Sequence, residues 1–528
     1  MKRLITLIAG ILCLIQAHAN DQRPLRQAQG SPNILWIFTD DHSYQTLGAY
    51  GDPRFEGIDI TPNLDKMAED GMRFDRCYVG NSICSPSRAT LLTGKHSHKN
   101  GKYTNEDRFD HNQPQFQKLL SANGYQTVMI GKIHIGGQFQ GFDYWEVLSG
   151  QGHYNDPFFL TAGGKRIDRK GYTTDIITEQ SIDWLKNRRD PNKPFMLMVH
   201  HKAPHRNWQP AVRHMDLYQD FDFELPDNFW DDYANRGTAA LDQDMSIDQS
   251  MSMIGDLKVI ADCPPNAEFG KALKKEQYTR RNEYFKKHRP TGKDLVAWKY
   301  QLYLKDYLRC IKAVDEGIGD LRDTLEALGL DENTVVIYSS DQGFYMGEHG
   351  WFDKRFMYEE SFRTPLLVDW PGVVKPGSVN TDLAQNIDFA PTFLDIAGLA
   401  VPEDMQGVSL VPLLEGETPK DWRGSLYYHY YEYPGWHSVK RHEGAFDKRF
   451  KLIRYYGKDV ENGEEWEFFD LERDPSEMKS EYNNPEYAGE LARMKKELEN
   501  LRELYDVPDE ALPQDREWIK PGQQAKKQ

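Results

Sequence analysis

Residues 33–41 read Asn-Ile-Leu-Trp-Ile-Phe-Thr-Asp-Asp, and this stretch indicates the class of fold. Its apolar residues follow one another without alternation, which is typical of a strand that is buried on both faces of a parallel sheet. The run ends directly in Asp40 and Asp41. We therefore expect a buried parallel strand that places two carboxylates at its carboxyl end.

Further apolar runs at residues 126–130, 195–199 and 334–338 are also predicted to be strands. The run Thr61-Pro62-Asn63 is typical of a helix start, and Gly71 marks the end of that helix. Strands that alternate with helices predict an α/β fold with a large, mostly parallel sheet flanked by helices. A long amphipathic helix precedes the last strand, with apolar residues at helical spacing at positions 304, 308, 311, 314, 318, 321 and 325.

The chain of 528 residues is longer than one hydrophobic core usually serves, so we expect more than one unit. We predict a main domain over residues 32–414, with a less regular insertion at 206–295. Beyond it, an aromatic stretch, an alternating run at 450–456 and a charged helix follow one another. These features predict a smaller α+β subdomain over residues 415–528.

The N-terminus has the pattern of a signal peptide over residues 1–19. Two basic residues precede an apolar run at 4–15, and Ala17-His18-Ala19 is an A-x-A cleavage site. The apolar run is too short to span a bilayer. We therefore expect export, to the periplasm or to the medium, without stable membrane insertion. Residues 20–31 are polar and are predicted to form a loose arm.

Charge and cysteine content restrict the partners of the chain. The formal net charge of -17 argues against a nucleic acid partner, because phosphate binding needs a basic surface. An anionic substrate would have to meet a local cluster of cations. The chain has five cysteines, and removal of the leader would take away Cys13. The sequence contains no C-x-x-C pair, which argues against a zinc ribbon. One disulfide is possible in an exported protein, and the sequence leaves its pairing open.

Polar residues of catalytic type follow each of the predicted core strands. In open α/β sheets the ligand site lies beyond the carboxyl ends of the strands. A single aspartate after a strand often only caps a turn. Polar residues of catalytic type after several strands instead favour one shared site. In the order of the strands, these residues are Asp40 and Asp41, then Lys132 and His134, then His200, His201 and His205, then Asp341 and Gln342.

The oxygen-rich part of this set predicts a cation site. Asp40, Asp41, Asp341 and Gln342 offer hard oxygen ligands, which select Ca²⁺ or Mg²⁺ over zinc. Carboxylates placed close together would repel one another without a cation. The histidines could in principle be zinc ligands. Since a lysine lies beside one of them, we favour anion binding and proton transfer for these residues.

Cys84 lies just before Pro86, at the start of a second helix that is predicted to end at Gly94. Backbone N–H groups and the helix dipole favour an anion at such a place, and Arg88 in the first turn would add a fixed positive charge. A buried structural cysteine and an activated thiolate nucleophile are both compatible with this position. A thiolate is a poor match for a hard cation site, so neither interpretation explains the neighbours of Cys84.

The run Cys84-Ser85-Pro86-Ser87-Arg88, followed by Ala-Thr-Leu-Leu-Thr-Gly, resembles the signature of type I sulfatases in the alkaline phosphatase superfamily. In that family a maturase oxidises the cysteine to formylglycine. The resemblance runs in order from about residue 32 to 400, which makes the main domain the catalytic one. The other matching segments are Ile37-Phe38-Thr39-Asp40-Asp41, Gly131-Lys132-Ile133-His134-Ile135-Gly136, Ala203-Pro204-His205, Asp341-Gln342-Gly343, and Lys354 in Phe352-Asp353-Lys354-Arg355.

The resemblance implies how the cation and the modified residue would act. Hydrated formylglycine at position 84 would attack sulfur while held on Ca²⁺, or Mg²⁺. The family commonly has Asp-Asn where this chain has Asp341-Gln342, which shifts the subgroup toward carbohydrate-directed members. The implied metal ligands are Asp40, Asp41, residue 84, Asp341 and Gln342.

The resemblance also implies roles for the charged residues. Arg88, Lys132 and Lys354 would neutralise the sulfate oxygens in the transition state. Either His205 or Lys354 would protonate the leaving alcohol. His134 would take a proton from the second hydroxyl of the hydrated formylglycine, so that sulfate is released.

Residues 341–365 resemble bacterial sulfatases that act on glycosaminoglycans, mucins or marine algal polysaccharides. A sulfated carbohydrate is therefore the expected substrate. The insertion and the C-terminal subdomain could wall a pocket that accepts chain ends. Candidate sugar contacts are His349, His437 and Arg441, and the aromatic residues between 430 and 436 could stack on sugar rings or pack the subdomain.

Two other functions stay open. The same superfamily includes phosphodiesterases and phosphonate monoester hydrolases, some of which also use formylglycine. A non-catalytic glycan-binding module is the alternative from another class, and it fits poorly with a complete set of catalytic residue types.

Overall fold

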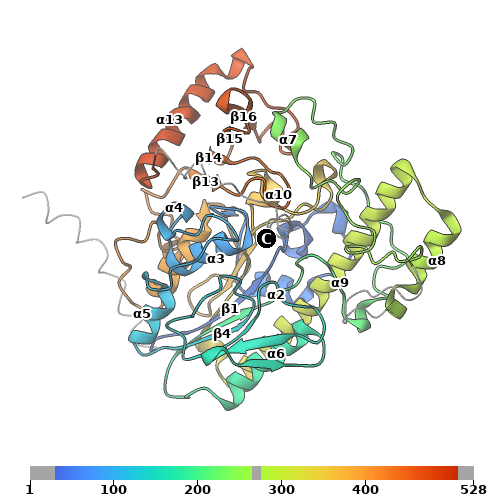
Figure 1. The fold of residues 1–528 in the computed structure, drawn as a ribbon. Helices are drawn as coiled ribbons and strands as arrows, with labels where there is room; N and C mark the ends of the chain where they lie inside the picture. The colour runs from blue at the N-terminus through green and yellow to red at the C-terminus, as the bar shows by residue number, and fades with distance from the viewer. Residues whose placement is uncertain (1–29, 264–274, 509–528) are drawn as a thin grey trace, which may run out of the picture.

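The computed structural model describes residues 30–263 and 275–508. A ten-stranded sheet forms the centre of the molecule (Figure 1). The predicted core strands are confirmed, and β5 extends the parallel part of the sheet. The parallel strands lie in the order β9 (Thr334–Ser340), β1 (Asn33–Thr39), β8 (Phe195–His200), β4 (Gln126–Gly131) and β5 (Tyr144–Leu148).

Shorter strands extend the sheet on both sides of its parallel middle. On one side, β10 (Leu366–Asp369) pairs antiparallel with β9 and with β2 (Met72–Phe74), and β11 (Ser378–Asn380) lies beyond β2. On the other side, β6 (Phe158–Thr161) and β7 (Arg166–Asp168) continue antiparallel from β5. The predicted α/β class is confirmed, with the parallel pairing concentrated in the middle of a mixed sheet.

Helices cover both faces of the sheet, which explains the unbroken apolar run of β1. All residues of β1 are buried, and successive residues enter opposite core clusters. One face packs against α2 (Pro62–Asp70), α6 (Thr173–Asn187) and α9 (Gly292–Ala327). The other face packs against α3 (Cys84–Thr93) and α5 (Phe116–Ala122).

The helix boundaries follow the predicted signals closely. α2 begins at Pro62 after Thr61 and ends before Gly71, as predicted. α3 ends before Gly94, but it begins at Cys84 itself, slightly before the predicted start near Pro86. Cys84 is therefore the first helical residue of α3, and its backbone N–H belongs to the free donors of the helix N-terminus.

The C-terminal region forms a separate four-stranded antiparallel sheet (Figure 1). Helix α13 packs across it and buries a small apolar cluster of its own. The alternating run and the terminal helix predicted here are both confirmed. The elements are β13 (Leu426–Tyr430), β14 (His442–Phe446), β15 (Phe450–Tyr456), β16 (Glu464–Asp470) and α13 (Ala488–Leu504).

The predicted insertion at 206–295 contains little regular structure among its described residues. Its helices are α7 (Thr238–Asp242) and α8 (Thr279–His288), with short 3-10 turns. Trp208 packs on Tyr303 of α9, with ring centroids 4.5 Å apart. The insertion is thus held against the main domain, close to the segment that follows β8.

The described residues contain no helix that is long and apolar enough to cross a bilayer. The predicted signal peptide and residues 20–29 of the predicted arm lie outside the described residues. Within the described residues, the cysteines are free thiols, namely Cys77, Cys84, Cys263 and Cys310.

Candidate active site

The residues predicted to share a site gather at the carboxyl edge of the parallel strands. Asp40 and Asp41 follow β1, and Asp341 follows β9. All three are fully buried, because the loops beyond the strands fold over this edge. Asp41 has a left-handed backbone, with φ of 70°, a conformation that side chains other than glycine adopt mainly where the surroundings impose it.

Three carboxylates and one amide form the centre of the site. We call Asp40, Asp41, Asp341 and Gln342 the carboxylate cluster. One oxygen from each aspartate lies within 4.8 Å of the others. The Asp41 backbone N–H donates to Asp341 Oδ1 at 3.0 Å. Cys84 Sγ lies 3.3 Å from Asp40 Oδ1 and 3.9 Å from Gln342 Nε2, so the first residue of α3 faces the cluster.

The carboxylate cluster fits a hard divalent cation. Ionised carboxylates at this separation repel one another unless a cation lies among them. Gln342 Oε1 is buried and has no hydrogen-bond donor among the described residues. A buried amide oxygen without a donor costs free energy, and a cation would satisfy it. Carboxylate and amide oxygens suit Ca²⁺ or Mg²⁺ better than zinc.

A basic side chain approaches each carboxylate of the cluster. These ion pairs are buried, so each partner depends on the other for its charge. Arg88 also donates from Nη1 to the backbone carbonyl of Lys132 at 2.6 Å, so two of the basic residues are linked directly. The pairs are Arg88 Nε with Asp341 Oδ2 at 3.0 Å, Lys354 Nζ with Asp41 Oδ1 at 2.6 Å, and Lys132 Nζ with Asp40 Oδ2.

The charge states differ between the thiol and the lysine beside it. Burial raises the pKa of the Cys84 thiol to about 12, so the thiol is protonated at neutral pH. This argues against an activated thiolate as the nucleophile. Burial lowers the pKa of Lys354, but Asp41, Cys84 and Asp353 together raise it above its usual value. Lys354 is therefore a fixed cation.

Two predicted histidines border the cluster. His205 Nε2 lies 3.8 Å from Asp41 Oδ2, while its Nδ1 bonds the Arg206 carbonyl. His134 Nδ1 lies 3.4 Å from Ser85 Oγ, beside the start of α3. Burial lowers the pKa of both rings well below the usual value, and neighbouring cations lower it further. Both rings are neutral near pH 7 and each has one nitrogen available for proton exchange.

The three candidate sugar contacts lie in different surroundings. His437 is close to the cluster, since its Nε2 lies 3.4 Å from Asp353 Oδ2, next to Lys354. His349 is fully buried, and its Nδ1 lies 2.7 Å from Asp231 Oδ2. Arg441 is nearly buried and donates from Nε to the Tyr431 carbonyl at 3.1 Å. The structure brings only His437 near the other site residues.

A second polar network lies beside Lys354, and the sequence did not single out most of its residues. Arg355 Nη1 lies 3.1 Å from Tyr430 Oη and 3.4 Å from Glu432 Oε1. Arg206 Nη1 approaches His437 Nε2 at 3.0 Å. The available signal was the charged triplet Asp-Lys-Arg at 353–355. We define the second polar network as Arg206, Asp353, Arg355, Glu432 and His437.

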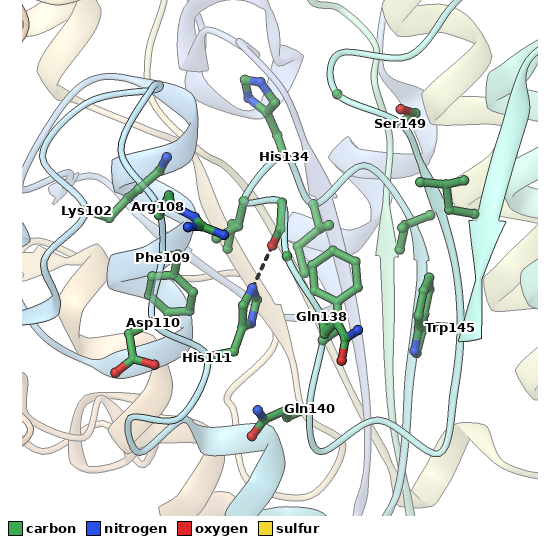
Figure 2. A pocket seen from close by; sticks show the side chains of 18 of the residues that line it. Lys102, Arg108, Phe109, Asp110, His111, His134, Gln138, Gln140, Trp145 and Ser149 are labelled. Carbon is green, nitrogen blue, oxygen red and sulfur yellow. Dashed lines mark hydrogen bonds between the residues drawn. The ribbon is translucent and has the colours of Figure 1, made fainter. Parts of the chain in front are cut away.

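A cavity of about 1050 Å³ adjoins the site on the side of His134 (Figure 2). It is lined by the loops 105–112 and 133–140 and by residues of β5. His111 Nε2 bonds the Gly136 carbonyl at 2.6 Å across its wall. Figure 2 shows Arg108 pointing toward the middle of the cavity, whereas His134 points away from it. The cavity therefore adjoins the candidate site at His134, which is one of its lining residues.

Comparison with known proteins gives consistent matches. The sulfatase family model matches residues 32–399, and a model of the C-terminal part of N-sulphoglucosamine sulphohydrolase matches residues 347–504. An N-acetylglucosamine-6-O-sulfatase of Bacteroides thetaiotaomicron is 46% identical over 93% of this chain and 90% of its own length. The human N-acetylglucosamine-6-sulfatase is 28% identical over 76% of this chain and 67% of its own length.

A solved structure of a protein in complex with its substrate D-glucosamine-2-N,6-O-disulfate superposes with a TM-score of 0.86. It is 46% identical, and the match covers 92% of this chain and all of that chain. Together with the buried cluster of carboxylates and cations at the sheet edge, these matches define a hydrolase of sulfuric esters. The chain belongs to the sulfatase family.

Proposed function

We propose that this protein removes a 6-O-sulfate from a terminal N-acetylglucosamine or glucosamine residue of a glycosaminoglycan fragment. The observation that carries the proposal is the 46% identity, over 93% of the chain, to a bacterial N-acetylglucosamine-6-O-sulfatase. The solved complex with a 6-O-sulfated glucosamine supports the same sugar. The proposed 6-O-sulfated glucosamine substrate is narrower than the range of sulfated glycans that the sequence motifs predict.

The proposal includes a modified residue and a cation. Formylglycine formed from Cys84 would, once hydrated, supply one hydroxyl that attacks sulfur and a second that lets sulfate leave. A Ca²⁺ or Mg²⁺ ion held by the carboxylate cluster would supply the charge that acidifies the attacking hydroxyl. The contact of Cys84 Sγ with Asp40 Oδ1 at 3.3 Å supports a shared position for the two groups.

The basic residues would bind the sulfate. Arg88, Lys132 and Lys354 each contact a different carboxylate of the cluster, so their charges surround the position of residue 84. Charged donors already held in place cost little reorganisation when negative charge grows on the sulfate oxygens. Arg88 is fixed further by its bond to the Lys132 carbonyl.

The histidines would move protons on opposite sides of residue 84. His134 lies beside Ser85, near the start of α3, where it can accept a proton from residue 84. His205 carries its free Nε2 toward Asp41, where it can take up a proton once a bound sulfate has raised its pKa, and then pass that proton to the leaving alcohol. Their lowered pKa values keep both rings neutral before an anion binds. A bound sulfate would raise both pKa values toward the physiological range.

The second polar network would recognise the sugar. Asp353 and Arg355 flank Lys354 in the chain, so hydrogen-bonding groups lie directly beside a sulfate-binding residue. Arg206 comes from the insertion, and Glu432 and His437 come from the C-terminal subdomain. Segments from three parts of the chain thus wall one side of a deep site. Such a pocket favours the end of a glycan over its middle, so we propose exo action.

Sulfate release from defined substrates tests the proposal. We expect the matured, Ca²⁺-loaded enzyme to hydrolyse N-acetylglucosamine-6-sulfate with a kcat/KM at least about tenfold above that for N-acetylgalactosamine-6-sulfate, because the epimeric hydroxyl would leave polar groups unpaired. A preference for a phosphodiester would instead favour the phosphodiesterase alternative. Glycan binding without any sulfate release would indicate a binding module. Cys84→Ala protein serves as the blank.

Export and maturation are parts of the same proposal. The A-x-A site at Ala17-His18-Ala19 supports cleavage before Asn20. Mass spectrometry of protein from the periplasm or medium of a maturase-competent bacterium tests both points at once. We expect a mature N-terminus at Asn20 and a peptide in which Cys84 has become formylglycine. An intact N-terminus or an unmodified Cys84 would contradict the corresponding part.

A further inference from the structure

Lys202 is a buried cation that the mechanism above does not use. It lies in the segment after β8, three residues before His205, and is only 5% exposed. Among the described residues, its ammonium has no hydrogen-bonding or ion-pairing partner. Its ammonium lies over the ring of Tyr154, with Nζ 4.9 Å from the ring centroid. The position of Lys202 is well defined, while its charge is poorly compensated.

The geometry around Tyr154 fixes this lysine against the site. Tyr154 Oη donates to the His205 carbonyl at 2.6 Å, and the His205 N–H donates to the Lys202 carbonyl at 3.0 Å. Lys202 and His205 therefore belong to one turn, and Tyr154 is hydrogen-bonded to that turn. The aromatic face offers partial compensation for a buried cation, worth less than an ion pair.

The charges at this edge do not balance. Arg88, Lys132 and Lys354 each have a carboxylate partner, whereas Lys202 is a fourth cation that has none in the described part of the chain. A divalent cation in the carboxylate cluster would add further positive charge. An unpaired buried charge costs several kcal/mol in general, so the arrangement favours an anion that arrives from outside.

Lys202 is close enough to the reacting groups for its charge to be felt there. Burial is the largest effect and lowers the pKa of its ammonium to about 8, while the Asp41 carboxylate acts in the opposite direction. Lys202 in turn adds to the effect of burial in lowering the pKa of Lys132 and of His205. Lys202 therefore lies within electrostatic reach of Lys132 and His205 and disfavours the charged form of each.

We propose that Lys202 is a fourth sulfate-binding residue, whose missing counter-ion is the sulfate group of the substrate. This inference rests on the proposed sulfate site and adds a residue that none of the sequence motifs singled out. The Tyr154 ring would hold the ammonium in place before sulfate binds. The product, inorganic sulfate, would meet the same four cations.

The test compares two lysines that are similarly buried but differ in their hydrogen-bond partners. In Lys202→Met, the side chain is slightly shorter and can still pack on Tyr154, but loses its charge. The control is Lys258→Met. Lys258 is 1% exposed and its pKa is also lowered by burial to about 8, but its Nζ donates to the Asp256 carbonyl at 2.6 Å and to the Trp208 carbonyl. Removal of Lys258 therefore breaks structural hydrogen bonds.

Isothermal titration of inorganic sulfate into the matured, Ca²⁺-loaded enzyme is the first measurement. We expect Lys202→Met to weaken sulfate binding by about 10- to 100-fold, as for loss of a charge-assisted hydrogen bond, and Lys202→Arg to restore most of it. The melting temperature of Lys202→Met should stay equal or rise, because a costly unpaired charge is gone. Lys258→Met should melt lower and keep its sulfate affinity.

Unchanged sulfate affinity in Lys202→Met, or a loss of melting temperature like that of Lys258→Met, would overturn the inference. The test of Lys202 can fail or succeed independently of the test of the proposed substrate. If the wild type releases no sulfate from N-acetylglucosamine-6-sulfate but Lys202→Met still binds sulfate more weakly, the proposed substrate fails and the role of Lys202 stands. Normal turnover with unchanged sulfate affinity in Lys202→Met would leave the proposed function intact and reject the role of Lys202.

Discussion

The carboxylate cluster and the second polar network lie side by side, yet the chain builds them differently. The cluster comes from the ends of neighbouring parallel strands, so strand pairing alone brings Asp40, Asp41 and Asp341 together. The second polar network combines a loop after β9, the insertion and the C-terminal subdomain, which must dock before its residues meet. The difference suggests that sulfate chemistry depends on the sheet, whereas sugar choice depends on how the outer segments pack.

Cys84→Ala should have the largest effect. Without formylglycine no nucleophile is present, so hydrolysis of both sugar sulfates and aryl sulfates should fall by about 10⁴-fold or more. The melting temperature should change little, since the thiol makes only long contacts of 3.3 and 3.9 Å. A sulfate-release assay measures the hydrolysis rate, and thermal melting measures the stability. Cys263→Ala, which removes a partly exposed free thiol, should behave as the wild type.

Loss of the divalent cation should come next. Chelation should lower activity on every substrate by about 10³-fold, because the ion supplies several kcal/mol of charge stabilisation. Added Ca²⁺ should raise the melting temperature of the wild type but not of Asp341→Asn. Asp315→Asn is the control, since this buried carboxylate binds the Asn63 and Leu64 N–H groups and should leave the Ca²⁺ response intact. Recovery with zinc alone would refute the hard-cation assignment.

His205→Gln should separate leaving groups. If His205 protonates the departing sugar alcohol, its loss should lower kcat for N-acetylglucosamine-6-sulfate by about 10²- to 10⁴-fold. An aryl sulfate releases a more acidic phenol and needs less protonation, so its rate should fall much less. Steady-state rates on both substrates measure the contrast. Equal losses on both would show that His205 acts in some other way.

Arg355→Lys should have the smallest effect and should disturb the second polar network without changing the carboxylate cluster. Lysine keeps the charge but loses the planar fork that reaches Tyr430 and Glu432. We expect kcat/KM for N-acetylglucosamine-6-sulfate to fall by about tenfold while aryl sulfate hydrolysis stays near normal. Arg449→Lys is the control, because Arg449 uses its planar fork on Asp470 of β16, and it should change neither rate. A parallel loss on aryl sulfate would place Arg355 with the sulfate-binding residues instead.

Much of the fold and of the sulfate site could be predicted because their signals are local in the chain. An apolar run such as 33–38 can bury both faces of a strand only inside a covered sheet, and the residue after it must then lie at the sheet edge. Helix boundaries at Thr61 and Gly71 also depend on neighbouring residues alone. The roles assigned to individual residues of the site stay predictions until the variants above are measured.

The candidate sugar contacts had no such local signal. His349 and His437 are both histidines near plausible motifs, but one lies in a core beside Asp231 and the other beside Asp353. Which of the two can approach a ligand depends on the packing of segments more than 80 residues apart, such as Asp353 and His437 (84 positions). A sequence pattern does not specify that packing, because many pairings of the same segments would satisfy their composition.

The sequence by itself determined the α/β sheet, the position of Cys84 at a helix start and the placement of carboxylates at the ends of β1 and β9, since each follows from residues that are close together in the chain. Only the tertiary structure decided that Lys202 is buried with no carboxylate partner within residues 30–263 and 275–508, and that Arg206, Arg355 and Glu432 lie near Lys354. The physical reason is that charge compensation is a property of space. A lysine is paired or unpaired according to which distant carboxylates the fold brings within reach.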